Sequence, residues 1–525
     1  MPGQYLIAAY GGSESSGRES IIHEQLQHWS AVGRLGLGED ERTETMNVAT
    51  VPEAAPAGLE VHSIDYIPQR ERHGKVRDQF TLWFQGNVVL ATLAVGFIGI
   101  SLGLNLFWTL VAIILGEVFG TFFMAFHSVQ GPRMGIPQLL QSRPQFGYLG
   151  ALIPQAIGLF LYIGFNVFNT IIAGQALSTL LPSLSVQVSI VVMAVLALVL
   201  TLGGYDWIHV VQRWGTYIFL VVFGIFTIGV LFTANLPAEQ LSPSNFQLTP
   251  FLVVLIVTAS YQVSQAPYVS DYSRYLRSDV PSRTTFLWTY FGSAIGSFWM
   301  IGLGALLLAA YPDATAVGSV VSGGDAIFNG FGTFALAVAL IGLVSVIALN
   351  LYSGSLALLA AVDVVKPIRA SLTTRVIAVA VIAILGTGGS LLIPEDFLGS
   401  YNNFLVILLY FLIPWTAINL VDFYFVRRGD YAIGEIFRPN GIYGRWNWRG
   451  LVAYFVGFAV MIPFFSIGTF FVGPIAEAAG GADFSLFVGL PVSALLYYLL
   501  ARGQDMSEER RLAATSEAQL EGAGA

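Results

Sequence analysis

The sequence contains no cysteine and few charged residues. The absence of Cys excludes disulfide bonds and thiolate metal sites. Charged side chains make up 11% of the 525 residues, against about 25% in ordinary soluble domains. Hydrophobic residues instead make up 55%, and the mean hydropathy is +0.69. This composition predicts an all-α integral membrane protein that crosses the bilayer many times.

The N-terminal 62 residues lack an apolar run of membrane length. Residues 1–62 are polar, with Gly, Ser, Glu and Ala prominent, and are predicted to form a disordered cytoplasmic tail. The first long apolar run starts after residue 75 and is too long for a signal peptide, so it should remain as a spanning helix. Residues 63–503 should form one transmembrane domain, and residues 504–525 a cytoplasmic C-terminal tail.

Twelve apolar segments are near the length of about 20 residues that a helix needs to cross the hydrocarbon layer. They lie approximately at 80–104, 107–128, 147–173, 184–203, 210–233, 250–270, 284–310, 330–361, 374–393, 402–421, 450–472 and 485–501.

The basic residues predict how these segments are oriented. With the N-terminus inside, all 24 Lys and Arg fall in the tails or the inner loops, the side on which such residues are retained. The outer loops carry acids only, including Glu239, Asp313 and Glu477. An even number of spans with both termini in the cytoplasm follows. The net charge of −8 lies largely in the N-terminal tail and the outer loops, so no nucleic-acid partner is predicted.

The sixth segment is interrupted partway through the membrane. In VTASYQVSQAPYVSDYSRYL (257–276), Ser264, Gln265 and Pro267 break an apolar run, and Pro removes a backbone donor. In lipid, such a break persists only where protein or a water-filled cavity satisfies the backbone. Interrupted helices hold the substrate site of many transporters. A simple proline kink within a bundle is the alternative.

Three stretches resemble the nucleobase:cation symporter family, which includes purine/cytosine permeases and hydantoin and allantoin relatives. They are IDYIPQRERHGKVRDQFTLWFQGN (64–87), GPRMGIPQLLQSRPQFGYLGALIP (131–154) and APYVSDYSRYL (266–276). The resemblance implies a LeuT-like fold, with two inverted repeats of five helices and two further C-terminal helices. It also implies a secondary transporter in the plasma membrane that imports a planar nitrogen heterocycle by cation symport. The second stretch lies in an inner loop and could instead be a rigid structural element.

An inverted repeat predicts that the first span breaks like the sixth. WFQGNVV supplies Gln85, Gly86 and Asn87 at the matching place, and Gly86 permits backbone conformations that other residues avoid. Two side-chain amides in an apolar run are costly unless they are hydrogen-bonded. These three residues are therefore candidate substrate-binding residues.

The third span places Phe165 and Asn169 four residues apart, on one helical face. The resemblance implies that Phe165 stacks on the heterocycle, where relatives often have Trp, and that Asn169 hydrogen-bonds the edge of the ring. Alternatively, Asn166 and Asn169 bond to a neighbouring helix.

Two positions depart from the family pattern. Gln265 stands where relatives often have Trp, and in SVIALNLYS Val346 and Ile347 replace an amide pair, which leaves only Asn350. Gln265 and Asn350 are the remaining candidate binding residues. The pocket is therefore expected to differ from a cytosine site.

The coupling ion is predicted to be H⁺ rather than Na⁺. No Ser or Thr occurs in residues 334–344, where sodium-coupled members of this fold place hydroxyl ligands, and hard cations require oxygen ligands. Glu117 is the carboxylate nearest a span centre and is the candidate proton carrier. The alternative is a fixed structural hydrogen bond. Asp206, Asp271, Asp363 and Asp422 lie at inner span ends, where they would cap helices or pair with Arg.

No enzyme, cofactor or metal signature is present. The six His lack ligand spacing, and no glycine-rich nucleotide loop or nucleophile elbow occurs. A non-transporting sensor for the same ligand remains an alternative. A channel is a third reading, although paired broken helices favour a midplane site over a continuous pore.

Overall fold

The computed structural model describes residues 64–523, except 367, 369–370, 394–396 and 469, so the predicted tail 1–62 lies outside the described residues. Within them, eight helices are long and apolar enough to cross a membrane, and one bent helix pair makes a ninth. Three shorter apolar helices occupy the remaining predicted spans. The elements at the twelve predicted spans are α2 (Asp78–Asn87) with α3 (Leu90–Val95) and α4 (Phe97–Ser101), α5 (Leu106–Ser128), α8 (Leu152–Leu180), α9 (Val186–Leu202), α10 (Gly204–Thr233), α11 (Leu248–Val263) with α12 (Ala266–Ser273), α13 (Ser282–Ala310), α15 (Phe331–Val365), α16 (Leu372–Leu392), α17 (Phe397–Val421), α19 (Trp448–Met461) and α21 (Ser485–Ala501).

Shorter elements connect these helices or follow them. They are η2 (Gln69–Glu71), α6 (Gln130–Met134), η3 (Leu140–Ser142), α7 (Arg143–Phe146), η4 (Ala238–Leu241), α14 (Ala316–Asp325), the π-helical turn η5 (Asp422–Val426), α18 (Ile433–Ile436), η6 (Ile462–Phe464), the antiparallel strands β1 (Ser466–Ile467) and β2 (Phe471–Val472), α20 (Pro474–Ala478) and α22 (Ser507–Ala523).

Several predicted span boundaries were wrong by five residues or more. The third span ends at Leu180 rather than 173, the fifth begins at Gly204 rather than 210, and the tenth begins at Phe397 rather than 402. The third helix begins at Leu152 rather than 147, because Gly147 takes a positive φ of 85° that ends α7 and turns the chain. The eleventh apolar segment is helical only as far as Phe464. The β1–β2 hairpin follows it. The apolar composition up to residue 472 therefore predicted too long a helix.

The helix contacts repeat between the two halves of the bundle. Helix α5 packs on α11 as α13 packs on α2, and α10 packs on α2 as α17 packs on α11. The pairs α8–α16 and α15–α9 correspond in the same way, while α19 and α21 pack on each other and on α17. This arrangement is two repeats of five spans plus two C-terminal helices, as the resemblance implied.

Matching glycine pairs bring the repeats into backbone contact. A Cβ added at Gly292 or Gly296 of α13 would lie 2.6 or 2.7 Å from the carbonyl oxygens of Phe80 and Phe84 in α2. In the other repeat, Cβ atoms at Gly116 and Gly120 of α5 would each lie 2.5 Å from a carbonyl oxygen of α11. A small residue every fourth position allows such close helix packing in membranes.

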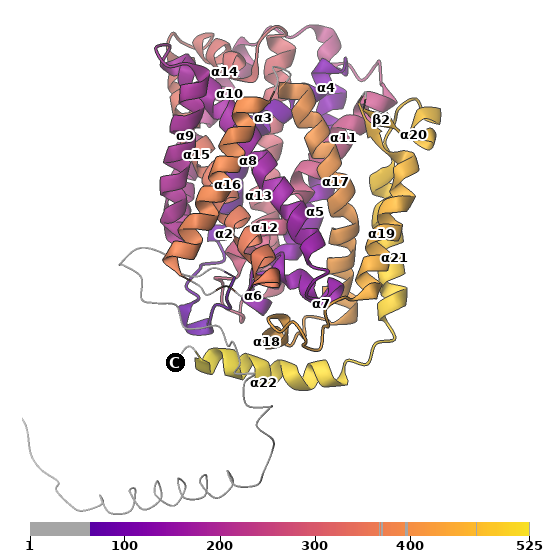
Figure 1. Cartoon of the computed structure of the whole chain (residues 1–525). Coiled ribbons are helices and arrows are strands. Elements are labelled where there is room, and N and C mark those ends of the chain that lie inside the picture. The colour runs from indigo at the N-terminus through magenta and orange to yellow at the C-terminus, as the bar shows by residue number, and fades with distance from the viewer. Residues whose placement is uncertain (1–63, 367, 369–370, 394–396, 469, 524–525) are drawn as a thin grey trace, which may run out of the picture. The chain divides into compact units, whose positions relative to one another are not determined.

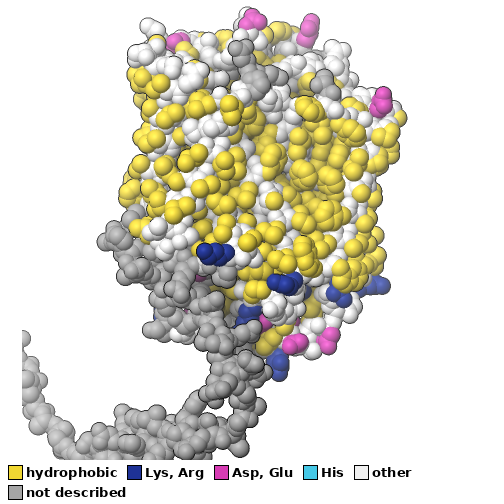
Figure 2. All heavy atoms as spheres, in the orientation of Figure 1, with side chains coloured by type: hydrophobic (Ala, Val, Ile, Leu, Met, Phe, Trp, Pro, Cys, Tyr) yellow, Lys and Arg dark blue, Asp and Glu magenta, His cyan; other side chains and the backbone are white. Residues whose placement is uncertain are grey.

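The outer surface of the bundle is apolar, as a lipid-facing surface must be. Hydrophobic side chains cover the middle of the face in Figure 2, and the Lys and Arg side chains visible there lie along its lower margin. On α10, Leu231 and Phe232 are 62% and 87% exposed, and on α16 Ile384 is 69% exposed. These exposed side chains are the surface that lipid would cover.

The C-terminal helix α22 packs across the end of the bundle near α18 (Figure 1). Glu521 accepts hydrogen bonds from the Tyr66 hydroxyl at 2.7 Å and from the backbone N–H of Gln69 at 3.0 Å. Near the other end of α22, Glu509 pairs with Arg427 at 2.9 Å. The segment predicted as a tail is therefore largely helical and bonded to both halves of the chain.

Candidate functional site

Two interrupted helices meet in the middle of the bundle. The first break falls at Val88 and Val89, directly after the predicted Gln85–Asn87, and it bends α2 by 55° relative to the helix formed by α3 and α4. The second falls at Ser264 and Gln265, as predicted, but α11 and α12 continue as one span without a bend above 40°. Both predicted interruptions are present, and the first redirects the chain more strongly.

A pair of side-chain amides joins the two breaks. Gln265 donates from Nε2 to Asn87 Oδ1 at 2.6 Å, and Asn87 Nδ2 lies 3.2 Å from Gln265 Oε1. Asn87 also donates to the Trp83 carbonyl at 2.7 Å, across the last turn of α2. The amides that would be costly in lipid therefore satisfy each other.

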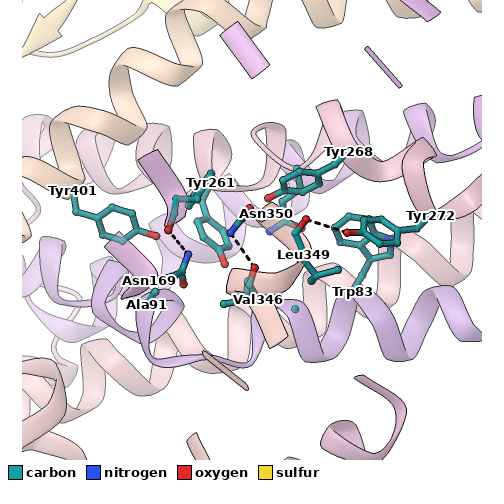
Figure 3. A pocket seen from close by; sticks show the side chains of 13 residues that line it. Trp83, Ala91, Asn169, Tyr261, Tyr268, Tyr272, Val346, Leu349, Asn350 and Tyr401 are labelled. Atoms are coloured by element: carbon teal, nitrogen blue, oxygen red, sulfur yellow. Dashed lines mark hydrogen bonds between the residues drawn. The ribbon is translucent and has the colours of Figure 1, made fainter. Parts of the chain in front are cut away.

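A narrow cavity is lined in part by Gln265 of this amide pair. Figure 3 shows side chains that line the cavity. Its free volume is about 20 Å³, which is room for about one water molecule. A bound heterocycle would need these side chains to move apart. The lining comes from α2, α3, α8, α11, α12, α15 and α17 and from the break between α11 and α12: Trp83, Gly86, Ala91, Phe165, Asn169, Tyr261, Gln265, Tyr268, Tyr272, Val346, Leu349, Asn350 and Tyr401.

Five of the seven predicted binding residues line this cavity, namely Gly86, Phe165, Asn169, Gln265 and Asn350. The other two do not. Asn87 lies behind Gln265, and the Gln85 amide lies against Gly215 of α10 and Gly342 of α15. Gln85 is 1% exposed, and neither of its amide atoms has a hydrogen-bond partner among the described residues.

Three polar atoms at the cavity lack partners among the described residues. Asn169 donates to the Phe165 carbonyl at 2.7 Å and Asn350 to the Val346 carbonyl at 3.0 Å, each within its own helix. Their Oδ1 atoms and the Tyr401 hydroxyl remain without hydrogen bonds. The cavity therefore presents two amide oxygens that accept hydrogen bonds and one hydroxyl that accepts or donates.

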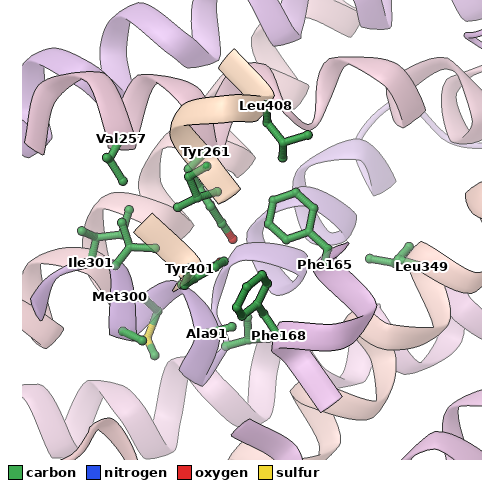
Figure 4. Close-up of a cluster of buried hydrophobic side chains, with 14 of the residues drawn as sticks. Ala91, Phe165, Phe168, Val257, Tyr261, Met300, Ile301, Leu349, Tyr401 and Leu408 are labelled. Atoms are coloured by element: carbon green, nitrogen blue, oxygen red, sulfur yellow. The ribbon is translucent and has the colours of Figure 1, made fainter. Parts of the chain in front are cut away.

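Aromatic rings form most of the remaining wall. Trp83 stacks on Tyr268 with ring centroids 5.8 Å apart, and it meets Tyr272 edge-on at 6.1 Å. Phe165 contacts Tyr261 edge-on at 6.2 Å, and Figure 4 shows both beside Tyr401 within the apolar core. Sequence reasoning missed these Trp and Tyr residues, since aromatic residues in apolar spans carry no signal of the direction in which they point.

The departure in the eighth span also reaches the cavity. Val346 lines it, whereas Ile347 does not and is 1% exposed. Of the two positions where relatives have amides, one therefore presents an apolar side chain to the cavity. Asn350, one helical turn after Val346, is the polar residue that α15 contributes.

Glu117 is buried near the middle of α5, behind the cavity wall. It is 1% exposed, and its Oε2 atom accepts hydrogen bonds from Ser297 of α13 and from Gln262 of α11. Its Oε1 atom has no partner among the described residues, and no described Lys or Arg forms an ion pair with it. A negative charge at this position would be buried without a countercharge.

The carboxylates at the span ends bind the loops. Asp363 pairs with Arg143 at 3.0 Å and Asp422 pairs with Arg427, as predicted for such positions. Asp271 instead accepts from the backbone N–H of Gln138 at 2.9 Å, and Asp206 lies 3.2 Å from His73. The contacts of Arg143 and Gln138 anchor the loop of residues 131–154 under the bundle.

The inverted repeat, the paired breaks and the cavity between them together define a membrane transporter rather than an enzyme. Residues 66–489 match the family described as a permease for cytosine/purines, uracil, thiamine and allantoin, and the chain belongs to that family.

Relatives of known name cover most of the chain. It is 39% identical over 447 residues to the putative purine-cytosine permease YxlA of Bacillus subtilis, covering 85% of this chain and 96% of that protein. The purine-cytosine permease fcyB of Emericella nidulans is 24% identical, with 85% and 89% covered.

Solved structures share the fold. The nucleobase-cation-symport-1 family transporter Mhp1, in a closed conformation with bromovinylhydantoin bound, superposes with a TM-score of 0.71 at 20% identity. That match covers 88% of this chain and all of Mhp1. A Na⁺-coupled sialic acid symporter superposes with a TM-score of 0.59 at 11% identity, covering 85% of this chain and 92% of that one. The LeuT-like fold implied by the sequence is confirmed.

Proposed function

We propose that this transporter imports a planar nitrogen heterocycle that carries N–H donors, such as a nucleobase, a hydantoin or an allantoin-type ring. The observation that supports this most is the pair of amide oxygens, Asn169 Oδ1 and Asn350 Oδ1, that lack donors in a cavity with aromatic walls. Ring N–H groups would satisfy both oxygens, and the aromatic faces would stack on the ring. The names of the relatives point to the same class of substrate.

Uptake by cells that express the protein tests this substrate class. Radiolabelled adenine, cytosine, uracil, hydantoin and allantoin are supplied to cells in which surface labelling has demonstrated the protein. Saturable uptake of at least one compound is expected, with competition by the unlabelled compound. If none is taken up and none binds the purified protein, the proposal is wrong.

Proton symport is the proposed coupling mode. Glu117 is buried without a countercharge, so a proton would remove the cost of its charge during the transport cycle. The first hydroxyl of α15 after residue 334 is that of Ser345, and it donates to the Gly342 carbonyl of its own helix. Residues 334–344 carry no hydroxyl of their own, so this part of α15 offers sodium no side-chain ligand.

Measuring uptake under imposed H⁺ and Na⁺ gradients distinguishes proton coupling from sodium coupling. Acid outside should accelerate uptake, a protonophore should abolish the effect, and replacement of Na⁺ by choline should change little. Glu117→Gln keeps the shape of the side chain and removes its titration, so it should lose the response to pH while retaining exchange of substrate. Steep sodium dependence would reject proton coupling, and a full pH response in Glu117→Gln would reject this residue.

The proposed location is the plasma membrane, with both termini in the cytoplasm. The distribution of Lys and Arg supports this orientation of the termini. Because the chain has no Cys, single introduced thiols report orientation without background. Ser244→Cys, in the proposed outer loop, should react with an impermeant maleimide on intact cells. Ser507→Cys, at the start of α22, should react only after the cells are opened.

A further inference from the structure

A chain of buried hydrogen bonds connects Glu117 to the cavity wall. The Gln262 amide nitrogen donates to Glu117, and the Gln262 oxygen accepts from Ser293 Oγ at 2.7 Å. Ser293 Oγ also lies 3.1 Å from Gln265 Oε1, and Gln265 lines the cavity. The three linking side chains are at most 5% exposed, so bulk water does not compete for these bonds.

Ser293 has one hydrogen and two acceptors within reach. Its hydroxyl can donate either to Gln262 or to Gln265, but not to both at once. The Asn87 amide, 3.0 Å away, donates to the hydroxyl oxygen and fixes its position. The direction of this one hydrogen therefore determines whether Gln265 Oε1 is held by Ser293.

The protonation of Glu117 changes the other end of the chain. When Glu117 is ionised, Ser297 and Gln262 both donate to its Oε2 atom. When a proton from solvent binds Glu117, the new O–H becomes a donor, and Ser297 is free to donate to the Ser293 carbonyl, 2.8 Å away. Gln262 then loses its ionic acceptor and keeps the contact of its nitrogen with Ser297 Oγ, which weakens its hold on the hydrogen of Ser293.

We propose that Ser293 is the positioning residue that couples protonation of Glu117 to the orientation of Gln265 in the substrate cavity. Proton binding releases the hydrogen of Ser293 from Gln262 so that it donates to Gln265 Oε1 and orients that amide in the cavity, and loss of the proton returns the hydrogen to Gln262. This inference rests on the proposed function, because it assumes a heterocyclic substrate and a transported proton.

Among the groups around Glu117, the chain through Gln262 and Ser293 is the direct route to the cavity. Tyr261 of α11 and Tyr290 of α13 are the titratable side chains that interact with it electrostatically. Between residues 248 and 265 and between 284 and 310, α11 and α13 carry no charged residue. The Tyr261 hydroxyl is bonded to Thr92 at 2.6 Å, away from the Ser293 chain.

Binding to the purified full chain at two pH values tests the coupling. The probes are adenine, cytosine, uracil, hydantoin and allantoin, at about pH 5.5 and about pH 8, which lie on either side of neutral conditions. In the wild type, the Kd of the bound compound should differ between the two pH values by about 5- to 150-fold, the usual range of coupling between two sites.

Ser293→Ala should still bind the compound, but its two Kd values should agree within about twofold, since the coupling is lost. Ser293→Thr keeps the hydroxyl and should restore the pH dependence. Ser355→Ala is the matched control, because Ser355 is buried on α15 and donates only to its own helix. Gln262→Met breaks the chain at another link and should behave as Ser293→Ala does, which covers the case of an unstable Ser293 variant.

The outcomes distinguish the two proposals. If the wild type binds with pH-dependent affinity and both Ser293→Ala and Gln262→Met keep that dependence, the relay is wrong and the proposed function stands. If the wild type binds none of the five compounds, or binds with no pH dependence, the substrate class or the proton coupling fails, and the relay fails with it.

Discussion

Asn87 and Gln265 hydrogen-bond to each other through their side-chain amides, with the shorter contact 2.6 Å long. They belong to the two interrupted spans, so the pair closes the gap between the inverted repeats beside the cavity. Relatives often have Trp where this chain has Gln265. In this chain, a polar contact between two helices therefore stands where relatives have an aromatic side chain.

This pair predicts a large stability difference between two buried glutamines. Gln265→Met leaves Asn87 Oδ1 buried without its donor, which should lower the free energy of unfolding by about 1–3 kcal/mol. Gln155→Met should be neutral or stabilising, because Gln155 is 0% exposed and neither of its amide atoms has a partner among the described residues. Thermal unfolding of both variants in detergent measures the difference, and equal losses would contradict the role of the pair.

Asn169 is predicted to bind substrate directly. Asn169→Ala removes the unpaired Oδ1 atom and should weaken binding by about 1–3 kcal/mol, or about 5- to 150-fold in Kd. Asn166→Ala is the control on the same helix, since Asn166 faces Gly386 of α16 rather than the cavity. Equal affinity of Asn169→Ala and the wild type, measured with the preferred heterocycle, would assign Asn169 a structural role.

Trp83 is predicted to supply the indole face that position 265 lacks. It lines the cavity and stacks on Tyr268, and stacking of aromatic rings contributes about 0.5–1.5 kcal/mol beyond area burial. Trp83→Phe should keep most of the affinity, whereas Trp83→Ala should raise Kd about tenfold or more through lost stacking and burial. An equal effect of Phe and Ala would show that the ring face is not what matters.

The sequence predicted the twelve spans well because apolar length is a direct requirement of the bilayer. Spacing put Phe165 and Asn169 on one helical face, since residues four apart on a helix lie on the same side. The family resemblance, not the spacing, implied that this face meets the substrate site. Gln85 and Asn87 were harder to place, because the break falls two residues after Gly86. The continuing helix rotates Gln85 toward α10 and α15, and only the packed structure fixes that rotation.

The cavity wall and the Glu117 chain depend on contacts between distant segments. Tyr401 and Trp83 are 318 positions apart and line the same cavity because α17 packs on α8, α2 packs on α15, and α8 and α15 pack on each other. Ser293, Ser297 and Gln262 are ordinary polar residues in apolar helices, and the sequence alone does not reveal that they converge on one carboxyl. The GxxxG spacing at Gly116 and at Gly292 was an available signal that α5 and α13 approach the interrupted helices closely.

The close approach of α13 to the first interrupted span gives the last prediction. A Cβ at Gly304 would lie 1.9 Å from the Leu93 carbonyl oxygen, so Gly304→Ala must push α3 away from α13. Overpacking of this kind costs about 1–3 kcal/mol or more, and it displaces Ala91 in the cavity wall. The variant should show a lower unfolding midpoint in detergent and weaker binding of the heterocycle. Gly224→Ala is the matched control within α10, because a Cβ there meets no atom within 4 Å, and Ala favours a helix over Gly by about 1 kcal/mol. An unfolding midpoint for Gly304→Ala equal to that of Gly224→Ala would contradict the backbone contact between α3 and α13.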